Sequence, residues 1–188
     1  LLQFFTKPSR VTRVKSYMII AIIGAPCSGK TTLMKSIISE LGGSEDIEPL
    51  SLFKCQKHND ILIIGRYSEN ETFGGTDRLS YGTISKFQEF INEQVKHYRH
   101  IIFEGDRFTN NVEWLLDNHN AKCYLLTVDE EEEKRRHKSR GDTQNEKWLQ
   151  GRRTQMNNLQ KNFNLMGRLE IRDTRKDDVK NEILHECS

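Results

Sequence analysis

The chain has 188 residues, enough for a single domain with a buried core of its own. Its 29 lysines and arginines nearly balance its 27 aspartates and glutamates, so the net charge of +2 points to no class of partner. Four scattered cysteines without a C-x-x-C pair argue against a zinc site and a disulfide framework, and indicate a reducing compartment such as the cytoplasm. No apolar run approaches the length of a membrane span, so we expect no membrane partner.

Residues 1–17 precede the first predicted strand. They are basic, contain no acid and show no strong periodicity. Because Met18 stands directly before that strand, we expect the native start at Met18, with residues 1–17 as a leader or extension. A transit peptide would have a similar composition, but the segment lacks a clear amphipathic stripe. Residues 18–188 are then expected to form one domain.

The first predicted strand, residues 18–23, is an unbroken β-branched run typical of a buried parallel strand. The loop after it fits G-x-x-x-x-G-K-[ST] at every fixed position. Its residues are Gly24, Ala25, Pro26, Cys27, Ser28, Gly29, Lys30 and Thr31. A helical stripe of apolar residues then runs from Thr32 to Leu41 and ends at a glycine pair.

This order of strand, glycine loop and helix predicts a site for a nucleoside triphosphate. Glycines let backbone N–H groups turn toward a polyphosphate, and the positive end of the helix faces the same anion. Lys30 is expected to reach the β- and γ-phosphates of ATP, and the Thr31 hydroxyl to hold Mg²⁺. Thr32, at the start of the helix, belongs to the same predicted site. The alternative, a chance Gly-rich turn containing Lys-Thr, does not account for the flanking strand and helix.

The rest of the chain alternates strands and helices. We predict strands at residues 50–55, 60–67, 100–103, 121–128 and 169–172, and helices at residues 83–98, 111–118, 130–140, 145–163 and 176–186. The first two of these strands are joined by a turn at 58–59, and residues 71–80 form a polar loop. Apolar strands alternating with helices predict an α/β fold, a parallel sheet covered by helices on both faces.

In such a sheet, ligands bind beyond the carboxyl ends of the strands. Glu104, Asp106 and Arg107 follow the strand at 100–103 directly. Glu104 is the better candidate to orient the magnesium shell or to accept a proton, with Asp106 in reserve; helix capping or a surface turn is the alternative. Arg107 could clamp a phosphate or pair with a nearby acid.

The loop at 74–80 is the second unusual stretch. Its glycine pair lets the backbone approach a ligand, and Asp77 and Arg78 side by side can bind a hydroxyl and an anion, which indicates an acceptor site. A hairpin loop with a capping Asp is the alternative. Tyr67, Phe73 and Tyr81 flank the loop and could stack on a base, although aromatic residues beside a loop are more often core.

Basic residues concentrate near the C-terminus. From Lys134 to Lys176, thirteen lysines and arginines face four acids, an excess of nine positive charges that suits a polyanion. Arg136 and Arg140 lie one helical turn apart and could close over a transferred phosphate. Arg152 and Arg153 could do the same or hold a nucleic-acid backbone, and a solvated helix face is the alternative for all four.

Together, the loop at 24–31, the string at 103–107 and the Arg136–Arg140 pair resemble the P-loop nucleoside and nucleotide kinase group, over most of the chain from Met18 onward. The resemblance implies a P-loop NTPase fold with a helical, arginine-bearing lid at about 129–155. It also implies that Arg136 and Arg140 grip the triphosphate, and that Glu104 acts as base or magnesium organiser.

More loosely, the strings at 75–80, 104–107 and 151–154 look like those of bacteriophage P-loop kinases that phosphorylate 5-hydroxymethyluracil in DNA. That resemblance implies DNA as a partner and the host cytoplasm as the location. The chain lacks a clear Asp-Arg-Tyr or Glu-Arg-Ser triplet of the usual nucleotide kinases, so the acceptor stays open.

Three functions follow as hypotheses. The first is a kinase that transfers the γ-phosphoryl group of ATP to a hydroxyl in DNA or, as the alternative, to a free nucleoside or nucleotide. In this hypothesis, Glu104 or Asp77 takes the proton of the attacking hydroxyl. The acceptor is bound by Asp77, Arg78, Asp106, Arg107 and Arg152. The second is an ATPase switch; the absence of an Asn-Lys-x-Asp string counts against a GTPase. The third is a non-catalytic nucleic-acid scaffold, which an intact Lys30-Thr31 disfavours. Oligomeric state is open.

Overall fold

The computed structural model describes residues 16–68, 74–139, 141 and 145–188. Its centre is a seven-stranded sheet in the order β2-β3-β4-β5-β1-β6-β7. The strands are β1 (Met18–Gly24), β2 (Glu45–Ile47), β3 (Cys55–His58), β4 (Ile61–Ile64), β5 (His100–Glu104), β6 (Ala121–Thr127) and β7 (Leu169–Asp173). From β4 to β7 across the sheet all neighbours are parallel, whereas β2, β3 and β4 pair antiparallel. The predicted α/β class is confirmed.

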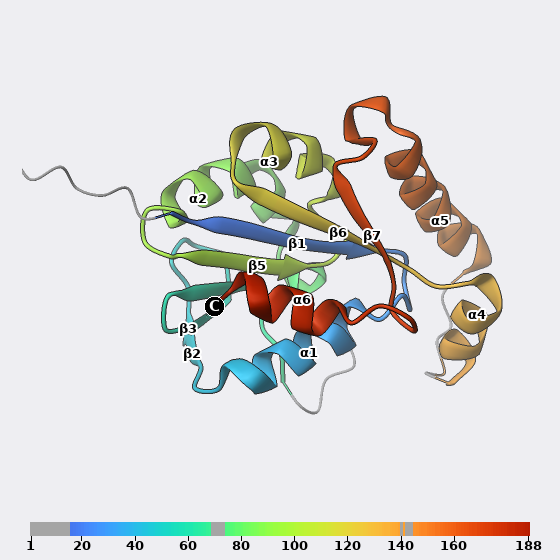
Figure 1. The fold of residues 1–188 in the computed structure, drawn as a ribbon, viewed down its shortest axis with the longest axis horizontal. Helices are drawn as coiled ribbons and strands as arrows, with labels where there is room; N and C mark the ends of the chain where they lie inside the picture. The colour runs from blue at the N-terminus through green and yellow to red at the C-terminus, as the bar shows by residue number, and fades with distance from the viewer. Residues whose placement is uncertain (1–15, 69–73, 140, 142–144) are drawn as a thin grey trace, which may run out of the picture.

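Helices cover both faces of the sheet, as Figure 1 shows. On one face, α1 (Lys30–Leu41) and α6 (Val179–Glu186) pack on Ile20 and Ile22 of β1. On the other, α2 (Phe87–Gln94), α3 (Val112–Asn118) and α5 (Glu146–Lys161) pack on Ile19, Ala21 and Ile23. Because successive strand residues point to opposite faces, a strand buried on both sides must be apolar at every position.

The antiparallel edge differs in detail from the prediction. The strand expected at 50–55 begins only at Cys55, because residues 50–54 form a turn in which Leu52 has a φ of 77°. The turn between β3 and β4 contains Asn59 with a φ of 54°, a conformation that Asn tolerates. The short edge strand β2 was not predicted, since its three residues carry no period.

The helix predicted at 83–98 is two elements. A 3₁₀ helix, η2 (Tyr81–Lys86), precedes α2, and the Ser80 side chain caps it by accepting from the Gly82 N–H. In a regular α-helix over 83–98, Ile84 would share an apolar face with Phe87, but it lies in the 3₁₀ segment and is exposed. The tighter 3₁₀ winding moves side chains away from the 3.6-residue stripe on which that prediction rested.

The C-terminal elements lie close to their predicted ranges. They are α4 (Glu130–Ser139), α5 and α6, which starts three residues later than expected because Asp178 caps it. The 3₁₀ turns η3 (Thr109–Asn111) and η4 (Phe163–Leu165) were not predicted. In Figure 1, α4 and α5 stand together at one end of the sheet. Within the described residues, no helix is both long and apolar enough to cross a membrane. Residues 1–15, Phe73 and Arg140 lie outside the described residues, so the expectations for them stay predictions.

Candidate active site

The candidate site lies at the carboxyl ends of β1, β5 and β6. In the parallel ladder, Ile22 of β1 is level with Glu104 of β5, and Gly24 is level with Leu126 of β6. The end of β5 therefore delivers its carboxylate beside the loop that leaves β1. The position is the one expected of ligand sites in open α/β sheets.

The glycine loop is shaped by close backbone contacts. A Cβ added at Gly24 would lie 2.6 Å from both Leu126 O and Ser28 Oγ, so no larger residue fits without displacing the strand or the loop. Gly29 has a φ of 101°, which favours glycine, and α1 begins at the next residue. The loop therefore presents the N-terminus of a twelve-residue helix to the site.

Lys30 is folded back over this loop. Its Nζ donates to Gly24 O over 2.8 Å and to Ala25 O over 3.0 Å. An ammonium group has three N–H donors, so these two bonds position the charge and leave a donor for an anion on the loop. Its charge offsets part of the rise that burial causes in the pKa values of Glu104 and Asp77, because the ammonium group lies near both carboxylates.

Thr31 and Glu104 meet across the site. The Thr31 hydroxyl donates to Glu104 Oε1 over 3.0 Å, and Glu104 is 1% exposed. A hydroxyl and a carboxylate oxygen are hard ligands of the kind Mg²⁺ takes from proteins while it keeps waters and substrate phosphates. These two residues fit the predicted magnesium site in chemistry and proximity.

Burial sets the electrostatics of Glu104. Loss of water raises the pKa of its carboxyl group above the usual value, and the Lys30 charge and the Thr31 hydrogen bond oppose that rise. The pKa of Tyr67 is raised well above its ordinary value by burial and by the negative charge of Glu104. Its phenol therefore stays protonated beside the carboxylate. Tyr67, considered from the sequence as a stacking residue, lies instead next to Glu104.

The segment around Asp77 is fastened to the end of β5. It forms a short 3₁₀ turn, η1 (Thr76–Arg78), and the Thr76 hydroxyl donates to Glu104 O over 2.8 Å. Arg107 donates to Thr76 O over 2.9 Å and to Asp77 O over 2.6 Å. Arg107 was expected to clamp a phosphate or pair with an acid; its Nε and Nη2 instead hold this segment in place.

Asp77 and Asp106 form a close acidic pair. The Asp106 N–H donates to Asp77 Oδ1 over 3.3 Å, and the side chains interact as well. Loss of water around its carboxyl group and then the Asp106 charge raise the pKa of Asp77 to about 7, although part of the residue stays exposed. A carboxyl group with that pKa can take up or release a proton near neutral pH, which a general base requires.

Two neighbouring arginines of α5 have different surroundings. Arg152 Nη1 lies 3.3 Å from Asp106 Oδ2, which brings Arg152 to the acidic pair. Arg153 is bonded to Glu133 of α4 over 3.1 Å and to Glu146 over 2.8 Å. Arg152 is therefore available to the site, whereas Arg153 joins α5 to α4.

Arg136 connects α4 to the glycine loop. Its Nε donates to Glu132 Oε1 over 2.7 Å and its Nη1 donates to Cys27 O over 3.0 Å. Arg135 pairs with the same Glu132 but is mostly exposed. Of the arginine pair predicted to grip the triphosphate, Arg136 lies over the loop as expected, and Arg140 is outside the described residues.

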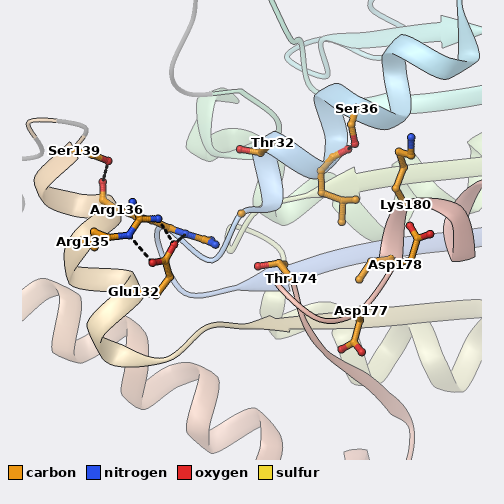
Figure 2. Close-up of a pocket in the computed structure, with 13 residues that line it drawn as sticks. Thr32, Ser36, Glu132, Arg135, Arg136, Ser139, Thr174, Asp177, Asp178 and Lys180 are labelled. Carbon is orange, nitrogen blue, oxygen red and sulfur yellow. Dashed lines mark hydrogen bonds and ion pairs between the residues drawn. The ribbon is translucent and has the colours of Figure 1, made fainter.

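A cavity of about 510 Å³ opens beside Gly29 (Figure 2). One wall is α1, a second is α4 with Arg136, and a third is the segment from Thr174 to Lys180. Thr174 ties that segment to the loop, because its hydroxyl donates to Ser28 O over 3.1 Å. The cavity is open at the phosphate loop, so it can hold the nucleoside of a triphosphate bound there.

The basic C-terminal stretch is largely compensated in three dimensions. Many of its cations pair with acids that lie outside residues 134–176 and so were not counted. These cations are Lys134, Arg135, Arg136, Arg152, Arg153, Arg168, Arg172 and Arg175. The excess of nine charges is therefore weaker support for a polyanion than the sequence suggested.

Some site residues were missed by sequence reasoning. The cavity walls at Ser36, Glu132 and residues 177–180 carry no local motif. The spacing of Glu132 and Arg136, four residues apart on one helix, is the one available signal.

A family model described as P-loop Nucleotide Kinase3 matches residues 15–175 of this chain. A search of curated proteins finds no match.

Proposed function

The chain belongs to the P-loop nucleotide kinase family, and from that premise we propose that it transfers the γ-phosphoryl group of ATP to a hydroxyl group on a second substrate. We further propose that this hydroxyl is the hydroxymethyl group of 5-hydroxymethyluracil in DNA. A free nucleoside or nucleoside monophosphate is the alternative acceptor.

One observation supports transfer most directly: the site contains two separate acidic positions. Glu104 accepts from Thr31, and the Asp77–Asp106 pair lies next to it, with Asp106 bonded to Arg152. A phosphotransferase needs one position for the metal that accompanies the triphosphate and another for the hydroxyl that attacks. The arrangement provides both.

The nucleotide side is assigned by contact with the loop. The triphosphate lies on the N–H groups at 24–31, with Lys30 and Arg136 as cations, and the nucleoside enters the cavity between α1, α4 and Thr174. Thr31 and Glu104 would hold Mg²⁺, which when bound neutralises charge on the phosphates.

On the acceptor side, Asp77 is the proposed base. Its carboxylate takes the proton of the hydroxyl while the acceptor oxygen bonds to the γ-phosphorus and the bond to the bridging β–γ oxygen breaks, releasing ADP. Glu104 is less suited to this step, because it already accepts a hydrogen bond from Thr31. Arg107 keeps Asp77 in position through the Asp77 carbonyl.

The test is an acceptor screen. The full chain is incubated with γ-labelled ATP and Mg²⁺, and either DNA containing 5-hydroxymethyluracil, the same DNA with thymine, or a panel of free nucleosides and monophosphates. Label in the modified DNA alone is the expected result. Label only in small molecules would favour the alternative acceptor. ATP hydrolysis that no acceptor changes would contradict transfer and favour an ATPase switch.

A further inference from the structure

Two exposed aromatic rings adjoin the acidic pair, each resting on an arginine. Tyr81, the first residue of η2, is 80% exposed, and the Arg107 guanidinium carbon lies 4.5 Å from its ring centroid. Trp148, in the first turn of α5, is 40% exposed, and the corresponding distance to Arg152 is 5.1 Å. A tyrosine beside a loop is more often buried in the core, but Tyr81 is exposed.

Each arginine contacts one residue of the acidic pair, Arg107 through the main-chain carbonyl of Asp77 and Arg152 through the carboxylate of Asp106. Arg107 donates to Asp77 O over 2.6 Å, and Arg152 lies 3.3 Å from Asp106 Oδ2. Each ring is thereby held close to one member of the pair. A single exposed aromatic side chain is ordinary. Two rings that each rest on an arginine, one from η2 and one from α5, next to the same two aspartates require a common explanation.

We propose that Tyr81 and Trp148 are stacking platforms for two bases of a single-stranded polynucleotide whose reacting nucleotide lies between them at Asp77. This deepens the proposed function and rests on it only for the place of the acceptor. One ring face lies on the guanidinium, so a base stacks on the other. A mononucleotide has one base and can occupy one platform only, whereas a strand supplies bases at both. Duplex DNA has its base faces covered, so the strand is unpaired at these positions.

A cavity lined by three cationic side chains lies where residues 75–79, just before Tyr81, meet Lys54 and Arg66. It has a volume of about 210 Å³ and is lined by Lys54, Arg66, Gly75, Arg78 and Leu79. Arg66 also pairs with Asp46 at 3.4 Å. A phosphodiester group adjacent to the base on Tyr81 would bind there, and binding would weaken as salt is raised.

The experiment measures strand binding without ATP. A fluorescent oligothymidylate of about ten nucleotides, within the usual footprint of such sites, is titrated with the full chain and anisotropy is recorded. We expect Tyr81→Ala and Trp148→Ala each to weaken binding about tenfold, which is typical of one lost stacking contact. Tyr81→Phe and Trp148→Phe keep a ring and should stay within about twofold. Melting curves establish that each variant is folded.

Phe163 provides the matched control. It is 84% exposed, on η4, and is not among the residues of the site. Phe163→Ala should bind the oligonucleotide as the wild type does. A duplex of the same sequence should bind more weakly than the single strand. Equal loss in Phe163→Ala, equal binding of duplex, or no loss in the two alanine variants at Tyr81 and Trp148 would each overturn the proposal.

The result is separable from that of the acceptor screen. Tight single-strand binding with no phosphoryl transfer would support the stacking platforms and contradict the proposal that the chain phosphorylates this acceptor. Transfer to a free nucleoside without strand binding would contradict the stacking platforms and support the kinase proposal.

Discussion

The Thr31 hydroxyl donates to Glu104 Oε1 across 3.0 Å, although 73 residues separate the two. The contact joins the start of α1 to the end of β5, and it exists because β1 and β5 are neighbours in the sheet with Ile22 level with Glu104. We expect the hydroxyl and the carboxylate to act as one unit toward a ligand on the loop.

If they act as one unit, their substitutions are not additive. We expect Thr31→Ala and Glu104→Gln each to lower the transfer rate about 100-fold and to raise the Mg²⁺ concentration needed, with the double variant little worse than either. Thr31→Ser, which keeps the hydroxyl, should retain most activity. Steady-state rates across a Mg²⁺ titration provide the measurement. Fully additive losses would show that the two residues act independently.

Asp77 should give the reaction a pH dependence near neutrality. With its pKa raised to about 7 by burial and the Asp106 charge, the base is protonated and inactive below that pH and active above it. The rate should therefore rise with pH around 7. Asp106→Asn removes the neighbouring negative charge, so the pKa of Asp77 falls and the rise moves to lower pH. Profiles of kcat/KM for the acceptor test this; an unmoved profile in Asp106→Asn would refute it.

Replacing the base itself should slow the chemical step. Asp77→Asn cannot take a proton, and we expect a loss of roughly 100-fold or more in kcat with little change in ATP affinity. Nucleotide titration followed by single-turnover kinetics separates the two quantities. If Glu104 were the base, Asp77→Asn would keep a nearly normal single-turnover rate.

Arg136 and Arg135 form a natural comparison on α4. Both pair with Glu132, but only Arg136 also reaches Cys27 O of the loop. We expect Arg136→Ala to reduce kcat/KM for ATP about 10- to 100-fold, because a cation at the triphosphate is lost. Arg135→Ala should lower kcat/KM for ATP by less than about threefold. A reversed order would show that the exposed arginine, not the loop-bound one, meets the nucleotide.

Arg153 is predicted to stabilise the fold. Its side chain is 16% exposed and its partner Glu133 is 6% exposed. Arg153→Ala leaves that carboxylate buried without its cation, and we expect unfolding to become about 3 kcal/mol easier. Arg153→Ala combined with Glu133→Gln should recover part of the loss. Urea denaturation measures both; an unchanged midpoint in the single variant would refute a stabilising role for Arg153.

Much of the architecture was predictable because residues close together in the sequence specify it. An unbroken β-branched run, a glycine-rich loop with Lys30 and Thr31, and a helical stripe specify strand, loop and helix locally. The same holds for the strands at β5 and β6 and for the α/β class. The predictions that were wrong, a strand at 50–54 and an α-helix at 83–86, concern a turn and a 3₁₀ helix whose geometry has little sequence period.

What only the tertiary structure decided is which of the candidate side chains meet. Arg107 and Arg153 were both possible phosphate ligands by residue type, yet the first holds a loop carbonyl and the second a buried glutamate. Tyr67 and Tyr81 were equivalent in sequence, and one lies beside Glu104 while the other is exposed. Periodicity determines which face of its own element a residue occupies. The partner on that face is set by strand order and register, which depend on the packing of the whole chain.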